Sequence, residues 1–136
     1  MPSYNELGIL FGLSSTVVVL FVRKKIKQPY HKSLWKSALL LFSLYTLILI
    51  ITEVRWYFIK EQLQNFDLNH NGFIDLDEYT DEAIEALNRR TQDTARNYAF
   101  LIAAVISTAI SFVFFIVDTL RTRRKIQKPK NPTIHE

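Results

Sequence analysis

The chain contains no cysteine, which excludes disulfide bridges and thiol-based metal or redox chemistry. It also lacks a recognisable catalytic constellation. Its three histidines are scattered, and neither a phosphate-cradling glycine loop nor an HExxH pattern occurs. Only three glycines and four prolines interrupt the 136 residues, so long helices meet few breakers. The sequence therefore does not predict an enzyme.

Charged residues are absent from three apolar blocks, which cover residues 7–22, 37–51 and 98–117. A membrane-spanning helix needs about 20 mostly apolar residues, and flanking residues extend the two shorter blocks toward that length. The alternative is a soluble three-helix bundle, but a soluble helix keeps a polar face that these blocks lack. We therefore expect an all-α membrane protein with three transmembrane helices, at residues 1–22, 37–55 and 98–120.

Positive charge is concentrated between the first two blocks and after the third. Residues 23–36 contain six lysines and arginines and no acid, and the tail 121–136 begins with a second basic run. Cytoplasmic or matrix-side segments carry an excess of Lys and Arg, so we place both basic segments on that side. The N-terminus and residues 56–97 are then extracytosolic. The N-terminus lacks the positive charge of a cleaved signal peptide, so we expect the first block to be retained. Which membrane is involved stays open.

The segment between the second and third blocks contains the twelve residues DLNHNGFIDLDE, from position 67 to position 78. Oxygen-bearing side chains stand at loop positions 1, 3, 5, 9 and 12, a glycine at position 6, and a main-chain carbonyl is available at position 7. Calcium takes six to eight oxygen ligands, and this spacing supplies them from one segment. The predicted calcium ligands are Asp67, Asn69, Asn71, Phe73, Asp75 and Glu78.

This segment resembles the EF-hand family of helix–loop–helix calcium-binding proteins. The resemblance covers Trp56 to Asn88 and includes apolar residues at helical spacing on both sides of the loop, namely Ile59, Leu63, Phe66, Tyr79, Ala83, Ile84 and Leu87. It implies one EF-hand between the second and third transmembrane helices. Asparagine at positions 3 and 5 lowers the negative charge of the loop, and only one hand occurs, whereas family members usually carry hands in pairs.

Small and charged residues near the apolar blocks have structural explanations. Gly8 and Gly12, and the ridge formed by Ala99, Ala103, Ser107 and Ser111, permit close helix packing, within the chain or between copies. The ionisable groups Glu53, Arg55 and Asp118 lie at block ends, where local pairing such as Asp118 with Arg121 is the ordinary expectation.

The sequence thus predicts a calcium-binding multi-pass membrane protein that regulates or stabilises a membrane assembly. Two alternatives remain open: an accessory subunit of a larger complex with permanently bound calcium, and a small calcium-gated channel or transporter subunit. Expected partners are the lipid bilayer and other membrane subunits or further copies of the chain, but no nucleic acid. The basic loop and tail are candidates for binding anionic lipid.

Overall fold

The computed structural model describes residues 3–127, including all side chains in that range except those of residues 92–95. The expected all-α class is confirmed, since the described residues contain helices and no strand. Short 3-10 helices carry the label η. The elements in chain order are α1 (Tyr4–Val22), η1 (Arg23–Lys25), α2 (Pro29–Gln64), η2 (Leu76–Glu78), α3 (Asp81–Gln92), η3 (Asp93–Tyr98) and α4 (Ala99–Gln127).

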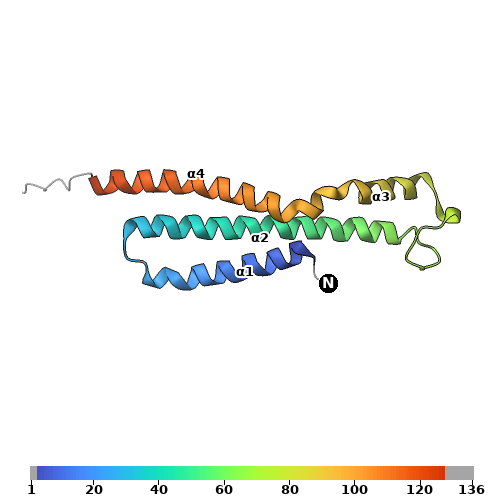
Figure 1. The fold of residues 1–136 in the computed structure, drawn as a ribbon, viewed down its shortest axis with the longest axis horizontal. Coiled ribbons are helices and arrows are strands. Elements are labelled where there is room, and N and C mark those ends of the chain that lie inside the picture. The colour runs from blue at the N-terminus through green and yellow to red at the C-terminus, as the bar shows by residue number, and fades with distance from the viewer. Residues whose placement is uncertain (1–2, 128–136) are drawn as a thin grey trace, which may run out of the picture.

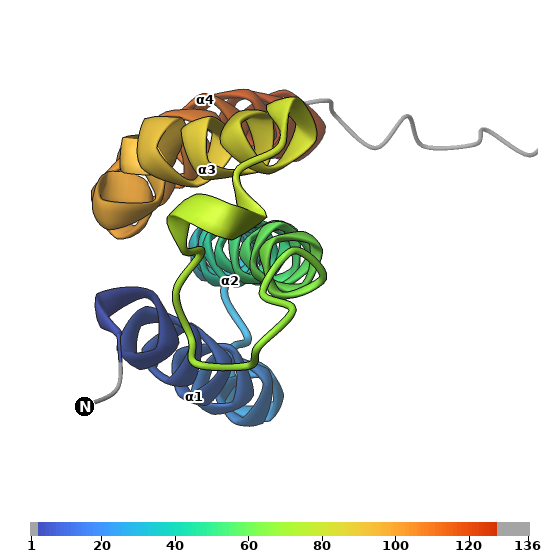
Figure 2. The same cartoon turned by 90° about the vertical axis from the view of Figure 1, so that its right-hand side faces the viewer.

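The molecule is elongated around α2, which runs through its centre (Figure 1). Helices α1 and α4 lie on opposite sides of α2, and the end-on view in Figure 2 shows α2 between them. Past the N-terminal end of α1, only α2 and α3 extend further along the long axis, and residues 65–80 connect them at that end of the molecule. The fold therefore has a three-helix part and a two-helix stalk, which we define as residues 56–64 of α2 together with α3.

Local sequence explains where the first two helices begin. Ser3 and Glu6 form a reciprocal cap, in which the Glu6 N–H donates to Ser3 Oγ at 3.2 Å and the Ser3 N–H donates to Glu6 Oε2 at 2.9 Å. Helix α2 begins at Pro29, because proline suits the first turn, where its missing N–H costs nothing. Residues 29–36 of the basic segment are therefore the first turns of α2.

Helix α2 continues without a break from the apolar block into the stalk, as the absence of internal Gly and Pro predicts. Its 36 residues correspond to about 54 Å at 1.5 Å per residue. The 19 residues of α1 correspond to about 28 Å, close to the roughly 30 Å thickness of a bilayer's hydrocarbon core. The three-helix part thus matches one bilayer in length, and the stalk extends past it.

The two glycines of α1 pack directly against α2. A Cβ atom at Gly8 would lie 2.7 Å from both Leu49 and the Tyr45 hydroxyl, and one at Gly12 would collide with Thr46. On the other side of α2, the whole predicted ridge of α4 is buried, and Leu49 and Ala103 are fully enclosed. These contacts confirm that the small residues serve packing within the chain.

Three helical segments are long and apolar enough to cross a membrane, judged by length and composition: Tyr4–Lys25, Pro29–Gln64 and Asp81–Gln127. Most of their large apolar side chains face outward, and Phe21, Val105 and Phe112 are 78%, 69% and 61% exposed. Water-soluble proteins rarely expose continuous apolar surfaces of this kind. The membrane-protein class expected from the sequence agrees with this surface.

Candidate metal site

The predicted ligand loop, which includes η2, occupies the tip of the stalk between α2 and α3 (Figure 1). The N–H of Asp67 donates to the Gln64 carbonyl at 3.2 Å, so the chain leaves α2 where the loop begins. Gly72 has a φ of 88°, the left-handed conformation that the sharp turn at position 6 requires. His70 also has a positive φ, 57°, which the sequence did not predict.

The carboxylate of Asp67 accepts hydrogen bonds from the turn of the loop. Its Oδ1 accepts from the Asn71 N–H at 3.1 Å, and its Oδ2 from the Gly72 N–H at 2.8 Å. Both Asn71 and Gly72 must curve back over Asp67 for these bonds to form. The first predicted ligand is therefore positioned at the inside of the turn.

Glu78 links the two ends of the loop. Its Oε1 accepts from the N–H groups of Leu68 and Asn69, at 2.9 and 3.1 Å, and its Oε2 accepts from the Asp75 N–H at 3.1 Å. The two oxygens of the carboxylate thus accept from backbone N–H groups that lie ten, nine and three residues earlier in the loop. The last predicted ligand is therefore aimed across the loop toward its beginning.

Asp75 receives the two asparagine side chains. Its Oδ2 accepts from Asn69 Nδ2 at 2.9 Å and from Asn71 Nδ2 at 2.7 Å, which brings positions 3, 5 and 9 together. All five side chains predicted as ligands consequently take part in hydrogen bonds inside the loop. Phe73, whose carbonyl is the sixth predicted ligand, has a side chain that is 75% exposed.

The helix after the loop begins later than the resemblance implies. Glu78 ends η2, and α3 begins at Asp81, with the Ala83 N–H donating to the Thr80 side chain at 3.1 Å. Among the described residues, no group of three or more His, Cys, Asp or Glu side chains is placed to hold a metal ion. The donor chemistry still fits calcium, because every predicted ligand atom is an oxygen.

Two loop carboxylates are buried, Asp67 at 9% and Glu78 at 8% exposure. The salt bridges among the described residues join other groups, and both carboxylates accept hydrogen bonds from backbone N–H groups. A buried charge is costly without an opposite charge nearby. The loop therefore presents negative charge that a cation would compensate.

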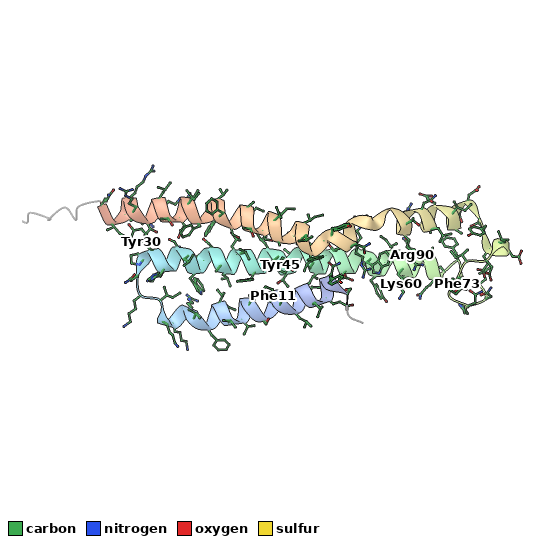
Figure 3. The ribbon with its side chains drawn as sticks, in the orientation of Figure 1. Phe11, Tyr30, Tyr45, Lys60, Phe73 and Arg90 are labelled. Carbon is green, nitrogen blue, oxygen red and sulfur yellow. The ribbon has the colours of Figure 1, made fainter. Side chains whose placement is uncertain are left out.

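The stalk below the loop joins α2 and α3 through a few apolar contacts. Leu63 is 7% exposed and Ala83 is fully buried, as the predicted apolar faces require, whereas Ile84 is 43% exposed. Lys60 and Arg90, labelled in Figure 3, lie on the two helices and line a cavity of about 350 Å³ with Phe73. The cavity also borders Asp67 and Gly72, so it adjoins the loop.

A polar cluster that the sequence did not predict lies where the stalk meets the three-helix part. We call it the outer cluster, and it consists of Asn5, Glu53, Trp56 and Arg96. Asn5 Nδ2 donates to Glu53 Oε1 at 2.9 Å and to the Arg96 carbonyl at 3.0 Å, and Arg96 pairs with Glu53 Oε2 at 3.2 Å. The Arg96 guanidinium also lies 4.4 Å from the centre of the Trp56 ring. Three helical elements thus meet at one carboxylate.

A second pair lies toward the basic end of the molecule. Asp118 binds Lys36 of α2 at 3.2 Å, so the salt bridge crosses between helices instead of joining Asp118 to Arg121 as the sequence analysis expected. Next to it, the hydroxyls of Ser33 and Thr122 are 3.3 Å apart. Lys128 and Lys130 of the basic tail lie outside the described residues.

Comparison of the chain with protein-family models, with curated protein sequences and with solved structures found no significant match. The resemblance to the EF-hand family therefore depends on residues 56–88 alone. What the molecule does has to be argued from its own loop, stalk and helices.

Proposed function

We propose that the chain is a calcium-binding multi-pass membrane protein, and that its extracytosolic loop regulates or stabilises a membrane assembly. The observation that carries the proposal is the burial of two carboxylates of the loop that form none of the salt bridges among the described residues. Asp67 and Glu78 are buried at its two ends, and the salt bridges of the described residues include neither. A calcium ion would supply the missing positive charge and accept the hard oxygen donors that this loop offers.

The residues that would hold the ion are Asp67, Asn69, Asn71, Asp75 and Glu78, together with the Phe73 carbonyl. The hydrogen bonds described above connect the five side chains within the loop, and calcium binding would exchange bonds at these oxygens for contacts with the ion. The bidentate carboxylate expected at Glu78 favours calcium over magnesium, which prefers octahedral geometry and retains its waters.

The proposed orientation rests on charge at the two ends of the long axis. The loop lies at one end, while η1 with its three cations and the basic C-terminal turns of α4 lie at the other (Figure 1). The outer cluster lies at one end of the apolar part of the helices, and the Lys36–Asp118 pair lies at the other. Lys36 and Glu53 are 17 positions apart on α2, or about 26 Å, close to the thickness of a hydrocarbon core. Positive charge then marks the cytoplasmic or matrix side.

The main alternative is an accessory subunit of a larger membrane complex in which calcium is permanently bound. The observation in its favour is the apolar surface of the loop region, where Leu68, Phe73 and Leu76 are 76%, 75% and 86% exposed. Such side chains fit a surface that is covered by another subunit. In this case calcium would only brace the loop.

Calorimetric titration of the purified full-length protein with calcium tests the proposal. The variant Glu78→Gln removes one proposed ligand, and the matched control Asp77→Asn removes the neighbouring exposed carboxylate, which is not a proposed ligand. We expect Glu78→Gln to abolish binding and Asp77→Asn to retain it. A dissociation constant close to the calcium concentration around the loop would favour regulation, and one far below that concentration would favour the permanently filled site. Absence of binding to the unaltered chain would refute the proposal.

A further inference from the structure

A cavity of about 380 Å³ lies at the end of the molecule opposite the calcium loop. Its lining comes from two neighbouring segments, the connection after α1 and the first two turns of α2. It is formed by Arg23, Ile26, Lys32, Trp35 and Lys36. We call it the basic pocket, because three of its five lining residues are cations and none is an acid.

The aromatic wall of the basic pocket is held in place from both sides. The Trp35 indole N–H donates to the Val19 carbonyl of α1 at 2.6 Å, which ties α2 to the last turns of α1. The Arg23 guanidinium lies 5.6 Å from the centre of the Trp35 ring. The Trp35 ring is thus anchored to α1, and Arg23 lies beside it.

The charge of the basic pocket is only partly compensated. Lys36 reaches both carboxylate oxygens of Asp118 at 3.2 Å. Arg23 and Lys32 take no part in the salt bridges found among the described residues. Two cations therefore face the pocket with no carboxylate assigned to them, and an anionic group would be attracted to it.

The surroundings of the basic pocket are apolar on the side of α1. Phe21 and Val22, directly before Arg23, are 78% and 43% exposed. A ligand that combines an anionic group with long apolar chains would satisfy the cations and cover these side chains together. Basic pockets between transmembrane helices on the cytoplasmic or matrix side bind phospholipid headgroups in this way.

We propose that the basic pocket binds the phosphate of an anionic phospholipid, whose acyl chains lie along the exposed face of α1. Arg23 and Lys32 hold the phosphate, and Trp35 forms the wall between headgroup and chains. This inference rests on the membrane placement proposed above, but it does not depend on calcium binding. Free inorganic phosphate carries the same anionic group as the lipid headgroup and is the alternative ligand of the pocket.

Fluorescence quenching in reconstituted bilayers tests the site. The full chain carries Trp56→Phe, so that Trp35 is the only tryptophan, and lipids brominated near the headgroup end of their chains serve as quenchers. Phosphatidylglycerol is compared with phosphatidylcholine, giving a relative binding preference at Trp35. The double variant Arg23→Gln/Lys32→Gln removes two pocket charges. The control Lys24→Gln/Lys27→Gln removes two charges from the same basic segment outside the pocket lining.

We expect an anionic preference that falls by about fivefold or more in the pocket variant, since each of the two removed cations contributes up to about fivefold where it contacts the bound headgroup. The control should change it by less than about twofold. Equal losses in both variants would mean diffuse surface attraction and would overturn the proposal, as would the absence of any preference. Loss of the preference on adding inorganic phosphate would assign the pocket to the free anion instead. Quenching of Trp35 by brominated phosphatidylcholine reports that this part of the chain lies in the bilayer. If phosphatidylcholine does not quench Trp35, the membrane placement in the proposed function fails, and this result is distinct from the absence of an anionic preference.

Discussion

Removal of the Glu53 carboxylate should destabilise the protein more than removal of any exposed acid. In the outer cluster, Glu53 accepts from Asn5 at 2.9 Å and from Arg96 at 3.2 Å, and the Glu53 and Arg96 side chains are 20% and 21% exposed. Breaking a buried pair costs about 3–5 kcal/mol, because the remaining charge stays desolvated. Allowing for the partial exposure, we expect Glu53→Ala to lower the free energy of unfolding by about 2–4 kcal/mol.

The matched control is Glu85→Ala on α3. Glu85 pairs with Arg89 at 2.7 Å, a shorter distance than in the outer cluster, but these side chains are 66% and 58% exposed. Solvent screening and side-chain entropy reduce such a pair to about 0.3–0.5 kcal/mol. The comparison therefore separates burial from bond length as the determinant of stability.

The free energy of unfolding can be measured by titrating the micelle-bound protein with a denaturing detergent. Helical circular dichroism follows the whole chain. In a Trp35→Phe background, Trp56 fluorescence follows the outer cluster, since Arg96 lies 4.4 Å from that ring. A double-mutant cycle with Arg96→Ala isolates the pairwise coupling, expected between about 0.5 and 3 kcal/mol. The reasoning is refuted if Glu53→Ala costs no more than Glu85→Ala.

Two further predictions concern helix packing and the stalk. Gly12→Leu should lower the free energy of unfolding by about 1–3 kcal/mol in the same detergent titration, because its side chain would collide with Thr46. Ser14→Leu on the exposed face of α1 should have little effect, and similar losses in both would contradict the packing argument. In the cysteine-free chain, spin labels at Lys60→Cys and Arg90→Cys report the α2–α3 separation. We expect it to change on calcium removal, as in sensor hands, whereas an unchanged distance would favour the permanently braced accessory subunit.

The features that sequence predicted well depend on local or periodic patterns. An apolar stretch without Gly or Pro is enough to predict that α2 continues into the stalk, and small residues spaced four apart are enough to predict close packing at Gly8 and Gly12. The left-handed turn at Gly72 follows from the fixed spacing of the loop. In each case the pattern that carries the prediction lies within one short stretch of sequence.

The features that sequence missed depend on contacts between distant positions. Asn5 and Arg96 are 91 positions apart, and no local pattern pairs them. The chain between Leu76 and Leu120 contains no Gly or Pro, yet a 3-10 stretch, η3, separates α3 from α4. At this stretch the Arg96 carbonyl accepts from Asn5 and its side chain binds Glu53. Tertiary contacts of this kind override the local preference for a continuous helix.

The same contacts determine how a change in the loop could reach the three-helix part. The loop joins α2, which continues as one helix, to α3, which is separated from α4 by η3. A change in the angle between α2 and α3 therefore acts on η3. In η3, Arg96 contacts Asn5 of α1 and Glu53 of α2. Calcium can shift such a junction only by the difference in its affinity for the two arrangements. A permanently filled site and a regulatory site would thus use the same residues, and the affinity of the loop relative to the local calcium concentration decides between them.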